Sequence, residues 1–150
     1  MKDQFMKSLI FASILAFVSG GLYVPSAKAS SVTSEKVDIE ITVKVNQKGF
    51  IDQKGKTFDG KNILKIPKDK LVRITFVFDE NLTSLAYGDT HQVAITGAEG
   101  WTKETQKIWA LNQRAHIIFQ TGKKDTQYRA YCILDCIGME HLNNLVIRVV

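Results

Sequence analysis

Apolar and polar residues alternate along most of this chain, and the alternation predicts short β-strands. The segment 37–45 alternates without interruption, which places one face of a half-buried strand at Val37, Ile39, Ile41, Val43 and Val45. Further strands are expected at 63–66, 71–78, 91–96, 108–111, 115–119, 128–132 and 145–150. No segment after residue 29 has the period of an amphipathic helix. The pattern predicts an all-β fold, a Greek-key antiparallel β-sandwich or barrel.

Residues outside the regular alternation are expected to complete the core. Gly and Lys punctuate 46–62 as a turn-rich segment, in which Phe50-Ile51 and Phe58 return to the interior. Residues 97–107 are expected to form a loop or a short helical turn. The three large aromatic residues Trp101, Trp109 and Tyr131 are expected to be core residues.

The first 29 residues have the pattern of a secretory signal peptide. Lys2 and Lys7 precede the apolar run 9–18, and small residues lead to Ala27-Lys28-Ala29, an A-x-A cleavage pattern. The expected organisation is a signal peptide at 1–29 and one domain at 30–150. A retained anchor is the alternative, because the apolar stretch is near the lower limit for crossing a bilayer. Both alternatives export the domain, to a periplasm or to the outer face of a membrane.

Charge and composition exclude some classes of function. The formal net charge is +5, and removal of residues 1–29 takes away three lysines and one aspartate, which leaves +3. The basic residues alternate with acidic ones and lack interleaved aromatic residues, so no nucleic-acid partner is expected. No G-x-S-x-G motif occurs, and no set of hydrolytic residues can be assembled, so an enzyme is the least favoured class.

The segment 131–141 concentrates side chains that bind soft metals. It holds both cysteines of the chain, Cys132 and Cys136, together with Met139 and His141. Thiolate, thioether and imidazole are the ligands that select copper. A disulfide between the two cysteines would close a very short loop and would therefore stabilise the fold little. Zinc is disfavoured, since structural zinc sites usually present two ligand pairs and this chain offers one.

A further ligand must come from another part of the chain. His91 shares a strand face with Val93 and Ile95, so it points toward the core at one end of its strand. That position suits either a satisfied core histidine or a metal ligand. His116 shares a face with Ile118, far from the cysteines in sequence, and is expected to be structural or exposed.

The cysteine and histidine loop before the last strand, with a second histidine on an earlier strand end, resembles the cupredoxin superfamily. The resemblance covers about 37–150 and implies copper as the cofactor, with His91 as the upstream ligand. Cys132-x₃-Cys136 looks like the dinuclear copper (CuA) loop of cytochrome oxidase subunit II and nitrous oxide reductase, C-x₃-C-x₃-H-x₂-M. This chain departs from that pattern in two ways. Four residues rather than three separate Cys136 from His141, and Asn144 stands where methionine is expected. Met139 is the candidate thioether in its place, and the alternative is a copper without a thioether ligand.

A mononuclear site is the alternative that these departures leave open. Cys136-x₄-His141-x₃-Leu145 has the spacing of an azurin-like loop with leucine at the axial position. Cys132 would then be a spare thiol, a liability in an oxidising compartment. The dinuclear site, with both cysteines bound to metal, is therefore favoured.

The resemblance implies an exported electron-transfer protein with a redox partner protein. The rival functions are copper handling, which implies a copper-receiving partner, and a metal-free binding module. Apolar residues around the loop favour a buried site and hence electron transfer. No membrane span is expected in the domain itself, unless the signal segment is retained.

Overall fold

The structure, a computed structural model, describes residues 36–46, 48–79, 90–134 and 145–150. Within these ranges the chain forms strands only, and no helix there is long and apolar enough to cross a membrane. The expected signal peptide at 1–29 lies outside the described residues. The strands are β1 (Ile39–Asn46), β2 (Gly49–Ile51), β3 (Leu64–Ile66), β4 (Leu71–Phe78), β5 (Val93–Thr96), β6 (Thr102–Glu104), β7 (Arg114–Gln120), β8 (Gln127–Cys132) and β9 (Leu145–Val149).

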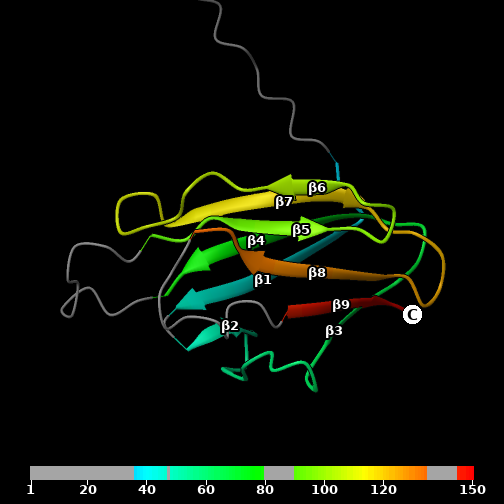
Figure 1. Ribbon diagram of the computed structural model, residues 1–150, viewed down its shortest axis with the longest axis horizontal. Helices are drawn as coiled ribbons and strands as arrows, with labels where there is room; N and C mark the ends of the chain where they lie inside the picture. Colours follow the sequence, from blue (N-terminus) through cyan, green and yellow to red (C-terminus); the bar gives the residue numbers. More distant parts are fainter. Residues whose placement is uncertain (1–35, 47, 80–89, 135–144) are drawn as a thin grey trace, which may run out of the picture. The chain divides into compact units, whose positions relative to one another are not determined.

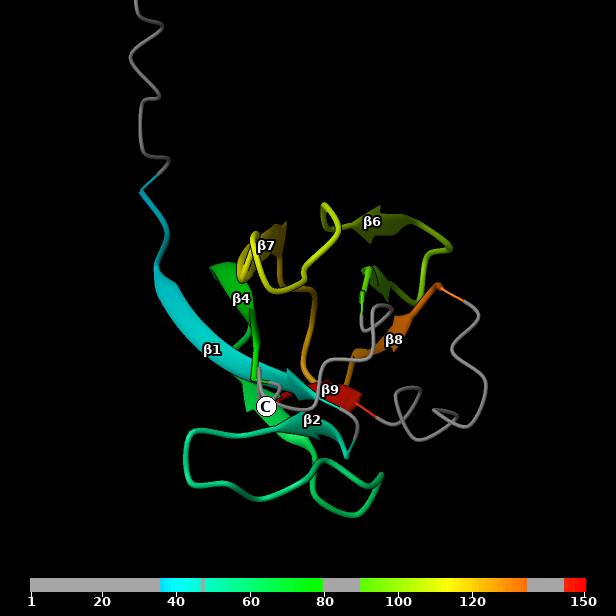
Figure 2. The same cartoon turned by 90° about the vertical axis from the view of Figure 1, so that its left-hand side faces the viewer.

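The strands form two sheets that face each other as a sandwich. One sheet has the order β2-β1-β4-β7 and the other has the order β3-β9-β8-β5-β6. Figure 2 shows β1, β4 and β7 on one side and β5, β6 and β8 on the other. This arrangement confirms the predicted all-β sandwich.

Both sheets are mixed rather than purely antiparallel. Strand β1 pairs with β4 in parallel, from Ile39 opposite Val72 to Val45 opposite Phe78, and β3 pairs with β9 in parallel. Strands β1 and β4 are joined through β2, β3 and the turns between them, a connection long enough to bring β4 back in the same direction. Strand alternation predicts which face of a strand is buried but carries no information on the direction of its neighbour.

The inward faces of both sheets form one core. Strand β4 contributes Val72, Ile74, Phe76 and Phe78, all buried as its alternation predicts. One apolar cluster joins residues of both sheets: Val43, Val45, Phe50, Phe58, Ile66, Val72, Ile74, Phe76, Val93, Ile95, Ile108, Ile117, Phe119, Tyr128, Ala130, Leu145, Ile147 and Val149. The predicted return of Phe50 and Phe58 to the interior is therefore confirmed.

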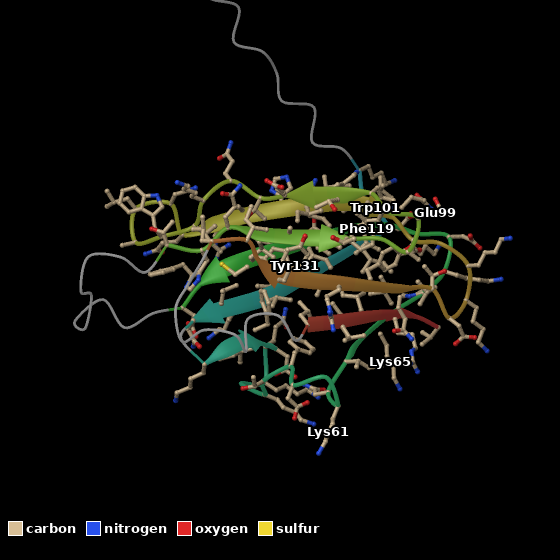
Figure 3. The ribbon with its side chains drawn as sticks, in the orientation of Figure 1. Lys61, Lys65, Glu99, Trp101, Phe119 and Tyr131 are labelled. Atoms are coloured by element: carbon tan, nitrogen blue, oxygen red, sulfur yellow. The ribbon has the colours of Figure 1, made fainter. Side chains whose placement is uncertain are left out.

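Three aromatic residues pack together at the side of the sandwich where β6 and β7 are the edge strands. The ring centroids of Trp101, Phe119 and Tyr128 lie 5.0–5.7 Å from one another (Figure 3 labels Trp101 and Phe119). Trp101 reaches this position because Gly97 has no side chain: a Cβ on Gly97 would clash with the indole ring. Trp101 is half-buried and packs against the core, as predicted.

Four local predictions are wrong. Residues 97–107 hold strand β6 rather than only a loop or a short helical turn, and 108–111 are a bridge and a tight turn rather than a strand. Trp109 is 41% exposed because it sits in that turn, where its backbone exchanges two 3.0 Å hydrogen bonds with Asn112. Tyr131 lies on the outer face of β8, since Tyr128, Ala130 and Cys132 occupy the inner one.

Candidate metal centre

His91 lies at one end of the sandwich, fully buried, two residues before β5. Its backbone exchanges two hydrogen bonds with Ile108, of 2.9 and 2.8 Å, and Ile108 is itself fully buried. The imidazole packs on Phe78 of the opposite sheet, with ring centroids 6.0 Å apart. The predicted inward orientation of His91 is therefore confirmed.

Cys132 lies on the same inward face as His91, on the neighbouring strand. It is the last residue of β8 and pairs with Val93, which stands two residues after His91. The next pair along is held by a 2.9 Å hydrogen bond from Ile133 N–H to the Gln92 carbonyl. The two side chains are thus diagonal neighbours, a relation in which residues are about 7–8 Å apart and within reach of long side chains.

The two ends of the predicted ligand loop are fixed side by side. Strand β8 ends at Cys132 and β9 begins at Leu145, and the two strands pair through Ala130 and Leu145. Leu145 is fully buried and shares the inward face with Ala130, so Cys132 lies between His91 and Leu145 on that face. Cys136, Met139 and His141 lie outside the described residues.

The residues that the structure does place have the chemistry that copper requires. His91 supplies a buried imidazole and Cys132 a half-buried thiol, and the two lie on adjacent strands and on the same inward face. Within the described ranges no three His, Cys, Asp or Glu side chains form a metal site. Cys136, Met139 and His141, which the sequence predicts as further ligands, lie outside those ranges.

His116 is excluded from this centre by its position. It lies on β7 opposite Thr75, with its side chain exposed on the outer face of the other sheet. It lines a shallow hollow with Lys103 and Glu104 rather than the interior. The prediction that His116 is structural or exposed is confirmed.

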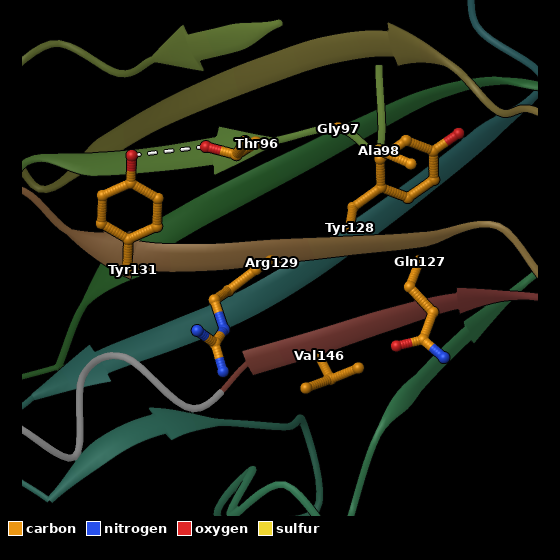
Figure 4. A pocket seen from close by; sticks show the side chains of 8 residues that line it. All are labelled: Thr96, Gly97, Ala98, Gln127, Tyr128, Arg129, Tyr131 and Val146. Atoms are coloured by element: carbon orange, nitrogen blue, oxygen red, sulfur yellow. Dashed lines mark hydrogen bonds between the residues drawn. The ribbon is translucent and has the colours of Figure 1, made fainter. Parts of the chain in front are cut away.

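The outer face of β8 carries polar side chains that the sequence did not indicate as functional residues. Arg129 and Tyr131 line a hollow of about 440 Å³ with Thr96, Gln127 and Val146. The Tyr131 hydroxyl lies 3.3 Å from the Thr96 hydroxyl (Figure 4). The expectation that Tyr131 is a core residue overlooked the alternation along β8, in which Tyr131 stands between the inward Ala130 and Cys132.

Comparisons with known proteins bear on the fold. No protein-family model and no curated protein sequence matches the chain. Among solved structures, auracyanin B matches with a TM-score of 0.50 and 16% identity over 81% of this chain and 95% of that one. A multicopper oxidase matches with a TM-score of 0.47 and 12% identity over 77% of this chain and 45% of the oxidase.

A laccase-like multicopper oxidase from Ochrobactrum sp. matches with a TM-score of 0.42 and 12% identity, over 75% of this chain and 30% of that chain. The two oxidase matches fall below a TM-score of 0.5, so the fold assignment depends on auracyanin B. This chain covers 95% of the auracyanin B chain. The described part of this chain therefore has the cupredoxin-like fold.

Proposed function

We propose that this protein is an exported copper protein that transfers electrons. Cys132, Cys136, His91, His141 and Met139 would hold two coppers in the proposed centre. The bound copper supplies a one-electron couple. Everything else that the function requires must come from the chain.

The placement of Cys132 is the observation that carries the proposal. A spare thiol would be expected away from the metal, whereas Cys132 faces inward as the diagonal neighbour of His91. It also stands at the point where the ligand-rich segment leaves β8. This position favours a centre that uses both cysteines over one in which Cys136 binds alone.

The surroundings of His91 support electron transfer over copper delivery. His91 is fully buried, its backbone is hydrogen-bonded to Ile108, and its ring packs on Phe78. Fixed ligands change position little between two oxidation states, and packed apolar neighbours exclude water. A copper carrier needs a site whose ligands open to exchange the ion. That this protein has no catalytic activity remains a prediction.

Retention of copper during redox cycling separates these two functions. The copper-loaded protein is cycled by voltammetry in the presence of an excess of a copper(I) chelator. An electron carrier should give a reversible one-electron wave and keep its metal. Loss of copper to the chelator on the first reduction would favour copper handling, and failure to bind copper at all would contradict both.

A further inference from the structure

A short hairpin turn displays two large apolar side chains to solvent at the same end of the sandwich as His91. The turn spans Trp109 to Asn112, and its first residue follows Ile108, whose backbone is hydrogen-bonded to His91. Leu111 is 82% exposed and Trp109 is 41% exposed. Val150, at 50%, is the one other large apolar residue exposed in the described ranges. The connection between β6 and β7 extends past the start of β7 (Figure 1).

The turn is rigid although its side chains are exposed. Trp109 and Asn112 exchange two backbone hydrogen bonds, each of 3.0 Å. The Asn112 side-chain amide also donates a 2.6 Å hydrogen bond to the Lys107 carbonyl. Exposing apolar surface to water is unfavourable, and nothing in these contacts requires Trp or Leu at the tip. Their exposure therefore points to a partner outside the described residues.

Positive charge flanks the tip. Lys107 and Arg114 are both exposed, and neither enters an ion pair within the residues that the structure describes. Two acidic side chains described near this end are engaged elsewhere: Asp79 pairs with Lys44 at 3.2 Å, and Glu104 accepts a 3.3 Å hydrogen bond from Gln92. An apolar tip between two cations matches a surface that is apolar inside and negatively charged outside.

We propose that the turn 109–112 inserts Trp109 and Leu111 into the headgroup region of an anionic membrane, with Lys107 and Arg114 on the lipid phosphates. Tryptophan is enriched at the membrane interface, where its ring is apolar and its N–H stays hydrated. Interfacial binding grows with the buried apolar area and with attraction to anionic lipid. Two side chains and two cations give weak, reversible binding, which brings the His91 end of the sandwich to the membrane surface.

A membrane suits the shape of this feature better than a protein partner does. A side chain as exposed as Leu111 projects from the surface, so a protein would need a matching groove, whereas headgroups move apart around it. This membrane binding does not depend on copper, because it involves only the turn and its flanking charges. It applies to the copper-free and copper-loaded protein alike.

Trp109 itself can report the insertion. Trp101→Phe removes the other tryptophan and keeps an aromatic ring against Phe119 and Tyr128. The exported protein carrying this change is mixed with phosphatidylglycerol/phosphatidylcholine vesicles or with pure phosphatidylcholine vesicles. We expect Trp109 emission to shift to the blue with the anionic vesicles and to shift much less with the neutral ones. An apolar N-terminal segment, if retained, would bind vesicles without shifting this emission.

Matched variants test which side chains carry the binding. Leu111→Ser should weaken the apparent affinity for anionic vesicles roughly tenfold or more, the value of one Leu side chain removed from water. Lys107→Gln and Arg114→Gln should each weaken it roughly fivefold. Val150→Ser is the control and should change nothing, since Val150 lies at the far end of β9, where its N–H donates to Ile66. An unchanged emission with anionic vesicles would overturn the proposal, and so would a Leu111→Ser variant that binds like the parent.

Discussion

Three separate contacts determine the position of His91, and each comes from a different part of the chain. Ile108 holds its backbone, Phe78 packs on its ring, and the β5–β8 pairing places Cys132 diagonally from it. Strand alternation alone predicted the inward direction. It left open whether the residue was a core histidine or a ligand, because its neighbour Cys132 comes from a strand some forty residues later.

Replacing His91 should therefore impair copper binding. Changes to groups that only support a ligand lower metal affinity about 10–100-fold, so His91→Ala should lower copper affinity at least as much. The visible charge-transfer bands should shift as well, because one nitrogen donor is lost. Competition against a chelator of known affinity gives the first quantity, and an absorption spectrum gives the second.

His116→Ala is the matched control for this variant. The His116 side chain is exposed on the opposite sheet, so neither affinity nor spectrum should change. Equal effects of the two substitutions, or a larger effect at His116, would show that the centre has been placed wrongly. Circular dichroism on both variants separates a lost ligand from a lost fold.

At the scale of the elements, prediction was most accurate where buried and exposed residues alternate, and it failed for short strands without that alternation. Strand β4 was predicted with its full bounds, because its buried and exposed residues alternate over its whole length. Strand β6 was missed, since all three of its residues are exposed and polar. The apolar run 108–111 indicated a strand, but its side chains are divided between the core and solvent.

The contact between Gly97 and Trp101 could not be read from the sequence. It depends on a hydrogen-bonded turn, in which the Gly97 N–H donates to the Trp101 carbonyl at 2.9 Å and the Gly100 N–H donates to the Gly97 carbonyl at 3.0 Å. The turn brings the indole ring over Gly97, against Phe119 and Tyr128.

Gly97→Ala should destabilise the protein by about 1–3 kcal/mol, the usual cost of overpacking a filled site. Chemical denaturation measures this change. The three atoms nearest to the added methyl all belong to the indole, so Gly97→Ala in a Trp101→Leu background should cost distinctly less. Equal costs in the two backgrounds would mean that Trp101 is not what excludes a side chain at position 97.

At the scale of the whole molecule, the sequence predicted the sandwich but not its mixed sheets. The parallel pairs β1–β4 and β3–β9 join segments far apart in the chain, and a local pattern does not specify such neighbours. The candidate centre was predictable in part, since alternation gave the inward face of His91, whereas the face of Cys132 was not predicted. Cys136, Met139 and His141 remain predictions from spacing alone.

We expect the exported protein to begin at or near Ser30. Signal peptidase cleaves after small residues in an A-x-A pattern, and Ala27-Lys28-Ala29 provides one after an apolar run of suitable length. N-terminal sequencing of protein recovered from the exported fraction tests this boundary. An intact Met1 on membrane-embedded protein would instead show that the segment is kept as an anchor.

The number of coppers per chain distinguishes a dinuclear centre that uses both cysteines from a mononuclear one. Copper analysis combined with electron paramagnetic resonance on the mixed-valence protein reports both the stoichiometry and the number of nuclei that share the unpaired electron. We expect two coppers per chain, hyperfine structure from two equivalent nuclei, and loss of both features in Cys132→Ser. One copper per chain with a spectrum that Cys132→Ser leaves unchanged would contradict it.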